Sequence, residues 1–209
     1  MNVTFIIIGI VILGIILSLV YIPRITSPRR LDSLFKFLLT LLATLAGVFL
    51  AFQISNYQEV QNEKDFIAGL LDESAYEFGL EINCLEEDYL SFIDNKQDII
   101  ESEELVKAPP LHTIVSLEIV INSTLLSKFG SSSYTEIHTV KHEIDGIRMS
   151  VNSPEVDPNV KLALIKSYVQ WCSHMRELLL IESSYIRGNI SADEVSRKYE
   201  KLITEFSLQ

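Results

Sequence analysis

Two long apolar runs at the start of the chain constrain its fold more than any other feature. Residues 3–22 carry no charged side chain, and residues 34–54 carry only Lys36, close to the beginning of the run. Each run has the roughly 20 residues that an α-helix needs to cross a hydrocarbon core about 30 Å thick. A lysine at the end of a span can extend its ammonium group to the lipid headgroups. The sequence therefore predicts a transmembrane hairpin over residues 1–55, with spans at about 3–22 and 34–54.

A cleaved signal peptide is the alternative interpretation of the first run. Such a peptide begins with positive charge and ends at a cleavage site of small residues. Neither Met1 nor Asn2 has a charged side chain, and the segment from Tyr21 to Arg24 contains a proline and no small residue. These features favour a retained span.

The charges that flank the two runs predict an orientation. The connector between them contains Arg24, Arg29 and Arg30, whereas the segment that follows the second run offers Lys64 alone over a similar distance. Lys and Arg near the ends of spans favour the cytoplasmic side of a membrane. We therefore expect a two-pass protein of a bacterial inner membrane, with the connector in the cytoplasm and everything after residue 55 outside it.

The rest of the chain, residues 56–209, is long enough for one soluble domain with its own core. The chain has a formal net charge of −11 although its first 55 residues are basic, so this domain is strongly acidic. An acidic domain is a poor partner for a nucleic-acid polymer. Most of the acidity falls in residues 57–157, so a small anionic ligand would have to be held by residues 158–209. The alternative is that both stretches are ordinary solvated helix surfaces.

The apolar pattern of this domain predicts an all-α helical bundle. No proline occurs from residue 31 to residue 108, so the second span is expected to continue as one long helix to about residue 95. Gly69 and Gly79 are the positions at which this helix could bend. Apolar residues in this helix recur every three or four positions and form a stripe on one face. Such a stripe suits packing in a bundle or self-association into a homo-oligomer. The stripe consists of Ile67, Leu71, Ala75, Phe78, Ile82, Leu85, Tyr89 and Phe92.

Local start and stop signals predict the remaining helices. Proline cannot donate a backbone hydrogen bond, so Pro109-Pro110 breaks the chain before a helix at 111–129, which Gly130 would cap. Capping boxes begin at Ser133 and Ser191, and Asp157-Pro158 is a strong helix start. The last three helices are therefore expected to begin near these positions, and the middle one to end at about residue 187.

Few residues point to chemistry. His138 and His142 lie four apart, the spacing of two metal ligands on one helix face, but no third ligand accompanies them and a surface pair is favoured. Cys84 and Cys172 would form a disulfide in an extracytoplasmic domain, or be small buried side chains in a cytoplasmic one. The sequence has no nucleotide-binding or nucleophile motif. We therefore predict a protein that is not an enzyme and needs no cofactor or metal.

A candidate site for an anionic ligand lies on the helix that follows Asp157, where basic and aromatic side chains alternate. Its residues are Lys161, Lys166, Tyr168, Trp171, Arg176 and Arg187. In the second span, Ala43, Gly47 and Ala51 form a small-xxx-small face that would pack on another copy or on the first span.

The outline of the chain resembles two groups of bacterial membrane proteins. The two spans, the membrane exit AGVFLAFQISNYQEVQNEKDFIAGLLDE and the helical tail are similar to those of small inner-membrane proteins of unknown function. They also resemble antiphage membrane effectors, including CRISPR-associated ones whose helical domain binds a cyclic oligoadenylate and whose spans then disturb the membrane. The resemblance is one of architecture and covers no motif residue by residue. It implies a cytoplasmic domain, opposite to the charge rule.

Two functions follow as expectations. In the first, the protein is a sensor or effector whose helical domain binds a ligand or partner, self-associates and acts on the bilayer through its spans. In the second, it is a structural or accessory subunit of a membrane complex, and the stripe of residues 67–92 docks on a protein partner outside the cytoplasm.

Overall fold

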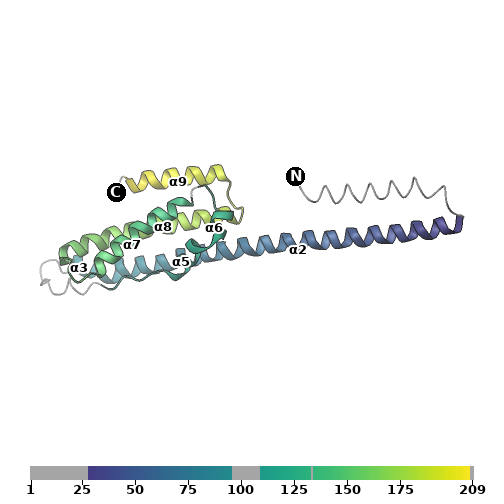
Figure 1. Cartoon of the computed structure of the whole chain (residues 1–209). Helices are drawn as coiled ribbons and strands as arrows, with labels where there is room; N and C mark the ends of the chain where they lie inside the picture. Colours follow the sequence, from purple (N-terminus) through teal and green to yellow (C-terminus); the bar gives the residue numbers. More distant parts are fainter. Residues whose placement is uncertain (1–27, 96–108, 133, 208–209) are drawn as a thin grey trace. The chain divides into compact units, whose positions relative to one another are not determined.

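The computed structural model describes residues 28–95, 109–132 and 134–207 (Figure 1). The predicted first span and the connector up to residue 27 lie outside this range. Within it, every regular element is a helix, which confirms the all-α class. The elements are α2 (Pro28–Asn83), η2 (Cys84–Leu90), α3 (Ser91–Asn95), α5 (Val115–Asn122), α6 (Thr124–Phe129), α7 (Thr135–Asn152), α8 (Pro158–Ile186) and α9 (Ala192–Ser207).

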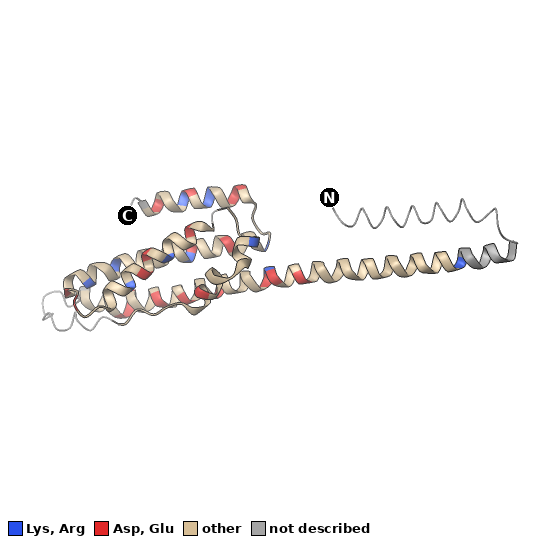
Figure 2. Ribbon diagram, in the orientation of Figure 1, with Lys and Arg blue, Asp and Glu red and all other residues tan. Residues whose placement is uncertain are grey.

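The chain divides into two compact units, residues 1–58 and 59–209. The sequence-based boundary falls after residue 55. In the first unit, the described residues belong to α2, which carries no charge between Lys36 and Glu59 (Figure 2). Large apolar side chains point outward on different sides of this stretch: Phe37, Leu45 and Leu50 are 64 %, 47 % and 60 % exposed. It is long and apolar enough to cross a membrane.

In the second unit, α2 changes from a helix that is apolar on all sides to one with a single buried stripe. Ile67, Leu71, Ala75, Phe78, Ile82 and Leu85 are buried, as the periodicity predicts. The stripe then shifts by one residue, since Ile93 is 5 % exposed and Phe92 is 44 % exposed. The cause is η2, a π-helical segment whose wider turns each take up more residues than an α-helical turn. The helix therefore reaches residue 95 as expected, but in a different register.

The core of the second unit forms around α8, whose buried residues occur along its whole length. α7 and α9 both pack on α8, and η2 contacts it as well. Two buried polar contacts hold α2 to other elements. The Ser74 hydroxyl bonds the Ser116 hydroxyl of α5 at 2.9 Å, and the Ser183 hydroxyl of α8 donates to the Ala68 carbonyl at 3.3 Å. These contacts place α8 at the centre of the bundle.

The predicted starts of the last two helices are confirmed. The Asp157 side chain accepts from the Asn159 backbone N–H at 2.9 Å and Pro158 opens α8. The Ser191 hydroxyl oxygen lies 3.3 Å from the Glu194 backbone N–H at the start of α9. Gly188, after α8, has the positive φ (75°) typical of a glycine that follows a helix. The capping box predicted at Ser133 involves a residue outside the described range.

The prediction of one helix over residues 111–129 is wrong. The segment forms α5 and α6, separated at Ser123, whose ψ of 145° is extended and whose hydroxyl donates to the Val120 carbonyl at 2.9 Å. Leu111 precedes the helix because its backbone N–H and carbonyl both pair with the Asn152 side-chain amide. Gly130 follows α6 as expected, but its φ is −66°. It is needed for space, since a Cβ there would lie 2.5 Å from the Leu126 carbonyl oxygen.

Candidate functional site

A groove lies between α8 and α9 in the described part of the chain, and we call it the α8–α9 groove. Its first pocket has a volume of about 260 Å³ and its second about 300 Å³, and the two share Glu177, Leu202 and Glu205. The groove exists because α8 and α9 are consecutive helices that turn back on each other after Gly188 and pack together.

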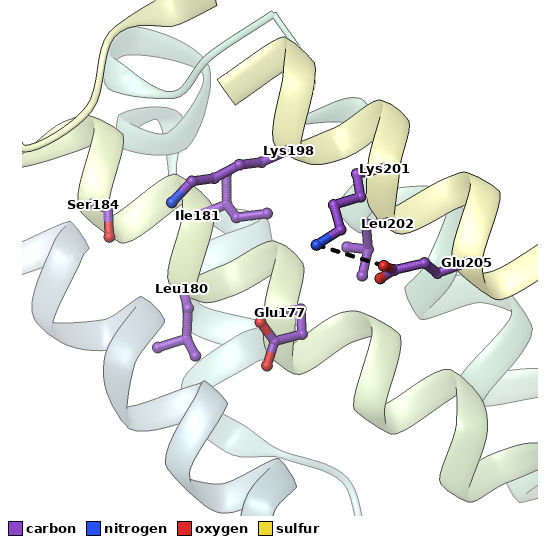
Figure 3. A pocket seen from close by; sticks show the side chains of 8 residues that line it. All are labelled: Glu177, Leu180, Ile181, Ser184, Lys198, Lys201, Leu202 and Glu205. Atoms are coloured by element: carbon purple, nitrogen blue, oxygen red, sulfur yellow. Dashed lines mark ion pairs between the residues drawn. The ribbon is translucent and has the colours of Figure 1, made fainter. Parts of the chain in front are cut away.

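The first pocket has charges of both signs (Figure 3). Lys198 and Lys201 reach over it from α9, and Glu177, Leu180 and Ser184 face them from α8. Both lysines already have acidic neighbours on their own helix. Lys201 lies 3.6 Å from Glu205 and Lys198 lies 3.9 Å from Glu194. We call this the basic end of the groove.

The second pocket has a different chemistry. Carboxylates from three elements line it: Glu86 of η2, Glu177 of α8 and Glu205 of α9. No lysine or arginine is among its lining residues. Its apolar surface comes from Val169, Leu202 and Phe206. We call this the acidic end of the groove.

His174 also lines the acidic end, and its environment is unusual for a histidine. The residue is 4 % exposed, and its Nδ1 is buried without a hydrogen-bond partner. Its ring belongs to a cluster with Trp171 and Phe206, whose ring centroids lie 6.0 and 4.6 Å away. Burial lowers the pKa of His174 below its ordinary value, because a charged imidazole would lose its hydration there. The ring is therefore neutral at pH 7.

A buried carboxylate beneath the groove fixes α9 to the bundle. Glu182 of α8 is fully buried and accepts hydrogen bonds from three donors. These are the Tyr199 hydroxyl at 3.0 Å, the Ser131 backbone N–H at 2.9 Å and the Ser131 hydroxyl. Burial and the adjacent carboxylate both raise the pKa of Tyr199, so its phenol stays protonated and donates. Glu182 thus joins α8, α9 and the segment before α7.

The side chains predicted to bind an anion are not gathered in one pocket. Tyr168 is 1 % exposed and its hydroxyl donates to Glu81 of α2 at 3.1 Å. Arg187 pairs with Asp72 of α2 at 2.5 Å, and Arg176 lies against Gly79 of the same helix. Lys161 is 8 % exposed and Lys166 is exposed.

Trp171 is the predicted residue closest to the groove, because its ring packs on Phe206 at 4.5 Å. None of the six lines either of the larger pockets. Their joint role in anion binding stays a prediction.

The two cysteines do not form the disulfide that an extracytoplasmic domain would allow. Cys84 is exposed and Cys172 is buried, and both are free thiols. Burial raises the pKa of Cys172, which contacts the Tyr168 hydroxyl, so this thiol is unreactive. Cys172 has the buried position predicted for a cytoplasmic domain, whereas Cys84, which was predicted to be buried as well, is exposed.

His138 and His142 are both exposed on α7. Among the described residues, no group of three or more His, Cys, Asp and Glu side chains is arranged to hold a metal ion. His138 instead packs edge-to-face on Tyr134 at 6.1 Å.

Sequence reasoning missed His174, Glu177 and Glu182. Glu182 had a visible signal, because it falls in the apolar stripe of α8 between Leu179 and Ile186. A charged residue in such a stripe is expected to have buried partners. His174 and Glu177 had no comparable signal in the sequence, because they line the groove only through the position of α9.

Comparison of the chain with protein-family models, with curated proteins and with solved structures found no match. The functional argument therefore rests on the geometry and chemistry of the chain itself.

Proposed function

We propose that the protein is a membrane-anchored sensor or effector. In this proposal, residues 36–58 of α2 lie in a lipid bilayer and the helical domain of residues 59–209 binds a small ligand in the α8–α9 groove. The domain self-associates and acts on the bilayer through its membrane segment. The protein supplies binding and assembly rather than catalysis.

The observation that carries the proposal is the change in character along α2. Between Lys36 and Glu59 the helix exposes large apolar side chains on every side, whereas from Ile67 onward it buries one stripe in the domain core. A helix that is apolar on all sides needs an apolar environment on all sides. Moving one large apolar side chain out of water is worth about 1.5–3 kcal/mol. A bilayer supplies that environment for the whole stretch.

The α8–α9 groove supports the sensor part of the proposal. It is a concave surface with pockets of about 260 and 300 Å³ lined by polar and apolar side chains, and small-molecule sites are concave and combine apolar surface with a few polar groups. Glu182 and Tyr199 tie α9 to the bundle core directly below it. A ligand that moves α9 would therefore change contacts in the core.

A second candidate function is that of a structural subunit in a membrane complex. The observation that favours it is a set of exposed apolar side chains on the domain part of α2: Phe66 (56 %), Tyr76 (67 %) and Leu80 (52 %). Their spacing places them near one face of the helix. A protein partner would cover this face and not the predicted stripe of residues 67–92, most of which is buried in the core of the domain itself.

Fractionation of cells and reporter fusions test the proposal. The full chain should stay with the membrane fraction after alkaline carbonate extraction, and recovery in the soluble fraction would refute membrane anchoring. A reporter after Gln209 that is fluorescent only in the cytoplasm should be active if the domain is an effector facing the cytoplasm. Activity of a reporter that works only outside the cytoplasm would favour the subunit function instead. A lone, stable homo-oligomer in mild detergent would count against the subunit function.

A further inference from the structure

The domain part of α2 has an exposed face with the pattern of a helix-packing surface. Phe66, Tyr76 and Leu80 are each more than half exposed. Together with Gly69 and Glu73, which are also exposed, they follow one another at intervals of three, four, three and four residues. This is the spacing of a and d positions, at which one helix packs against another. We call these five residues the α2 seam.

Gly69 gives an independent sign that another helix packs on the α2 seam. Glycine in the middle of a helix costs about 1 kcal/mol relative to alanine. Packing within the domain does not require a glycine here, because a Cβ on Gly69 would lie within 4 Å of no other described element. A missing side chain on an exposed helix surface lets a second backbone approach closely. The glycine therefore suits contact with a partner rather than contact within the domain.

The charge around the seam predicts the charge of the partner. Residues 65–95 contain nine acidic side chains and no lysine or arginine (Figure 2). Asp72 pairs with Arg187 of α8, whereas Glu73 and Glu77 form no ion pair with any described residue. Glu73 belongs to the seam, and Glu77 lies one helical turn after it. Lysine or arginine on a partner would complement these two carboxylates.

A second copy of the chain does not fit the α2 seam. By the proposed membrane anchor, on which this step rests, two copies in one bilayer have their α2 helices running in the same direction. In a parallel pair of helices, a residue at an a position faces its own counterpart. Glu73 of one copy would therefore face Glu73 of the other. Two like charges brought together out of water destabilise the contact, so the charge favours a different, basic partner.

We infer that the α2 seam binds an amphipathic helix of a protein partner, whose apolar stripe is flanked by lysine or arginine. The stripe packs on the apolar residues of the seam, its backbone approaches α2 at Gly69, and its basic side chains pair with Glu73 and Glu77. From residue 66 to residue 80 α2 rises about 21 Å, so about two heptads of the partner are engaged. The inference goes beyond the sensor function by adding a protein-binding surface apart from the α8–α9 groove. It deepens the subunit function by naming the chemistry of the partner.

Two synthetic helical peptides, each three heptads long, test the inference. Both have leucine at every a and d position, and the flanking e and g positions are lysine in one and glutamate in the other. Each peptide carries a fluorophore and is titrated with the full chain in phosphatidylcholine nanodiscs, and nanodiscs without the chain give the background. Fluorescence anisotropy should show saturable binding of the lysine peptide, at least about tenfold tighter than that of the glutamate peptide. No saturable binding, or equal binding of both peptides, would overturn the inference.

Two glycines provide matched variants that locate the binding surface. Gly69 and Gly146 of α7 are both exposed, and a Cβ on either would lie within 4 Å of no other described element. Glutamine at either position should leave the fold intact, with a Tm no lower than that of the unchanged chain. Gly69→Gln blocks the close approach and should weaken binding of the lysine peptide at least about fivefold. Gly146→Gln should leave the affinity unchanged, and equal affinities of the two variants would overturn the inference.

Glu73→Lys and Glu143→Lys change the net charge of the chain by the same amount. Both glutamates are exposed, but Glu143 lies on α7. Glu73→Lys places a like charge against the lysine peptide and should weaken its binding at least about tenfold, whereas Glu143→Lys should weaken it less than about twofold. Equal losses would mean that the peptide responds only to the net charge of the chain.

The other outcomes separate this inference from the proposed function. If Gly69→Gln, but not Gly146→Gln, broke up a homo-oligomer in mild detergent, a second copy would occupy the seam and the inference would be wrong. Carbonate extraction tests the anchor without any peptide. A chain that stays in the membrane but binds no lysine peptide at the seam would disprove the inference alone. Binding at the seam by a chain that carbonate releases would disprove the anchor alone.

Discussion

The hydrogen bond from Tyr199 to Glu182 is the contact whose removal most sharply tests the account of how α9 is held. Tyr199→Phe deletes the hydroxyl and leaves the ring in place. Glu182 is fully buried, and it would keep only the two donors of Ser131. A hydrogen bond to a charged group contributes about 1.5–3 kcal/mol. For a domain of this size, 1 kcal/mol corresponds to a change of about 2–4 °C in Tm, so the expected decrease is about 3–12 °C.

Tyr185→Phe is the matched control, because Tyr185 also packs on the core but its hydroxyl forms no hydrogen bond with the described residues. Its free energy of unfolding should change by less than about 0.5 kcal/mol, the effect of a typical surface substitution, which corresponds to about 1–2 °C in Tm. Thermal unfolding of the full chain in mild detergent, followed by circular dichroism and Trp171 fluorescence, measures both variants. The fluorescence reports the α8–α9 contact because Trp171 packs on Phe206. Equal shifts for the two variants would refute the role assigned to Glu182.

Two further predictions concern titration and thiol chemistry. Burial lowers the pKa of His174 in the folded chain. When the pH is lowered below about 6.5, the ordinary pKa of histidine, the unfolded chain therefore binds a proton before the folded chain does. The free energy of unfolding then decreases as the pH is lowered further, until the pH passes the lowered pKa of the folded state. His174→Gln should flatten this dependence, which is at most about 1.4 kcal/mol per pH unit, whereas the exposed control His142→Gln should keep it. Denaturant titrations at several pH values measure the free energy of unfolding. Unchanged pH dependence in both variants would contradict the role assigned to His174. In a thiol assay of the native chain, Cys84 should react and Cys172 should react only after unfolding; two thiols that appear only after reduction would reveal a disulfide instead.

Local signals made several elements predictable from the sequence. The starts of α8 and α9 follow from side chains that bond the first turn of their own helix, at Asp157 and Ser191. The buried stripe of α2 follows from periodicity alone. The late start of α5 was not predictable in this way, because Leu111 is held out of the helix by Asn152, a residue 41 positions away in the sequence.

The candidate site was less predictable than the fold. The basic residues of α8 attracted attention because their charges stand out in the sequence, but Arg187 and Arg176 face α2 and Asp72 neutralises the former. The pocket depends instead on which carboxylates of η2, α8 and α9 come together, and that is a property of packing. A π-helical segment sets the direction of Glu86, and neither composition nor α-helical periodicity predicts such a segment.

Cysteine accessibility tests the central claim, that residues 36–58 lie in a bilayer, most directly. Val48 and Val115 are 64 % and 65 % exposed in the isolated chain, so their cysteine variants differ in location and hardly in intrinsic exposure. Both are made in a background without native cysteines, Cys84→Ser with Cys172→Ala, because Cys172 would otherwise react in denaturing detergent, and they are treated with a membrane-impermeant maleimide in intact vesicles of either orientation. The account predicts that Val115→Cys reacts in one orientation and that Val48→Cys reacts in neither until the membrane is dissolved in denaturing detergent. Equal reaction of the two cysteines in intact vesicles would contradict it.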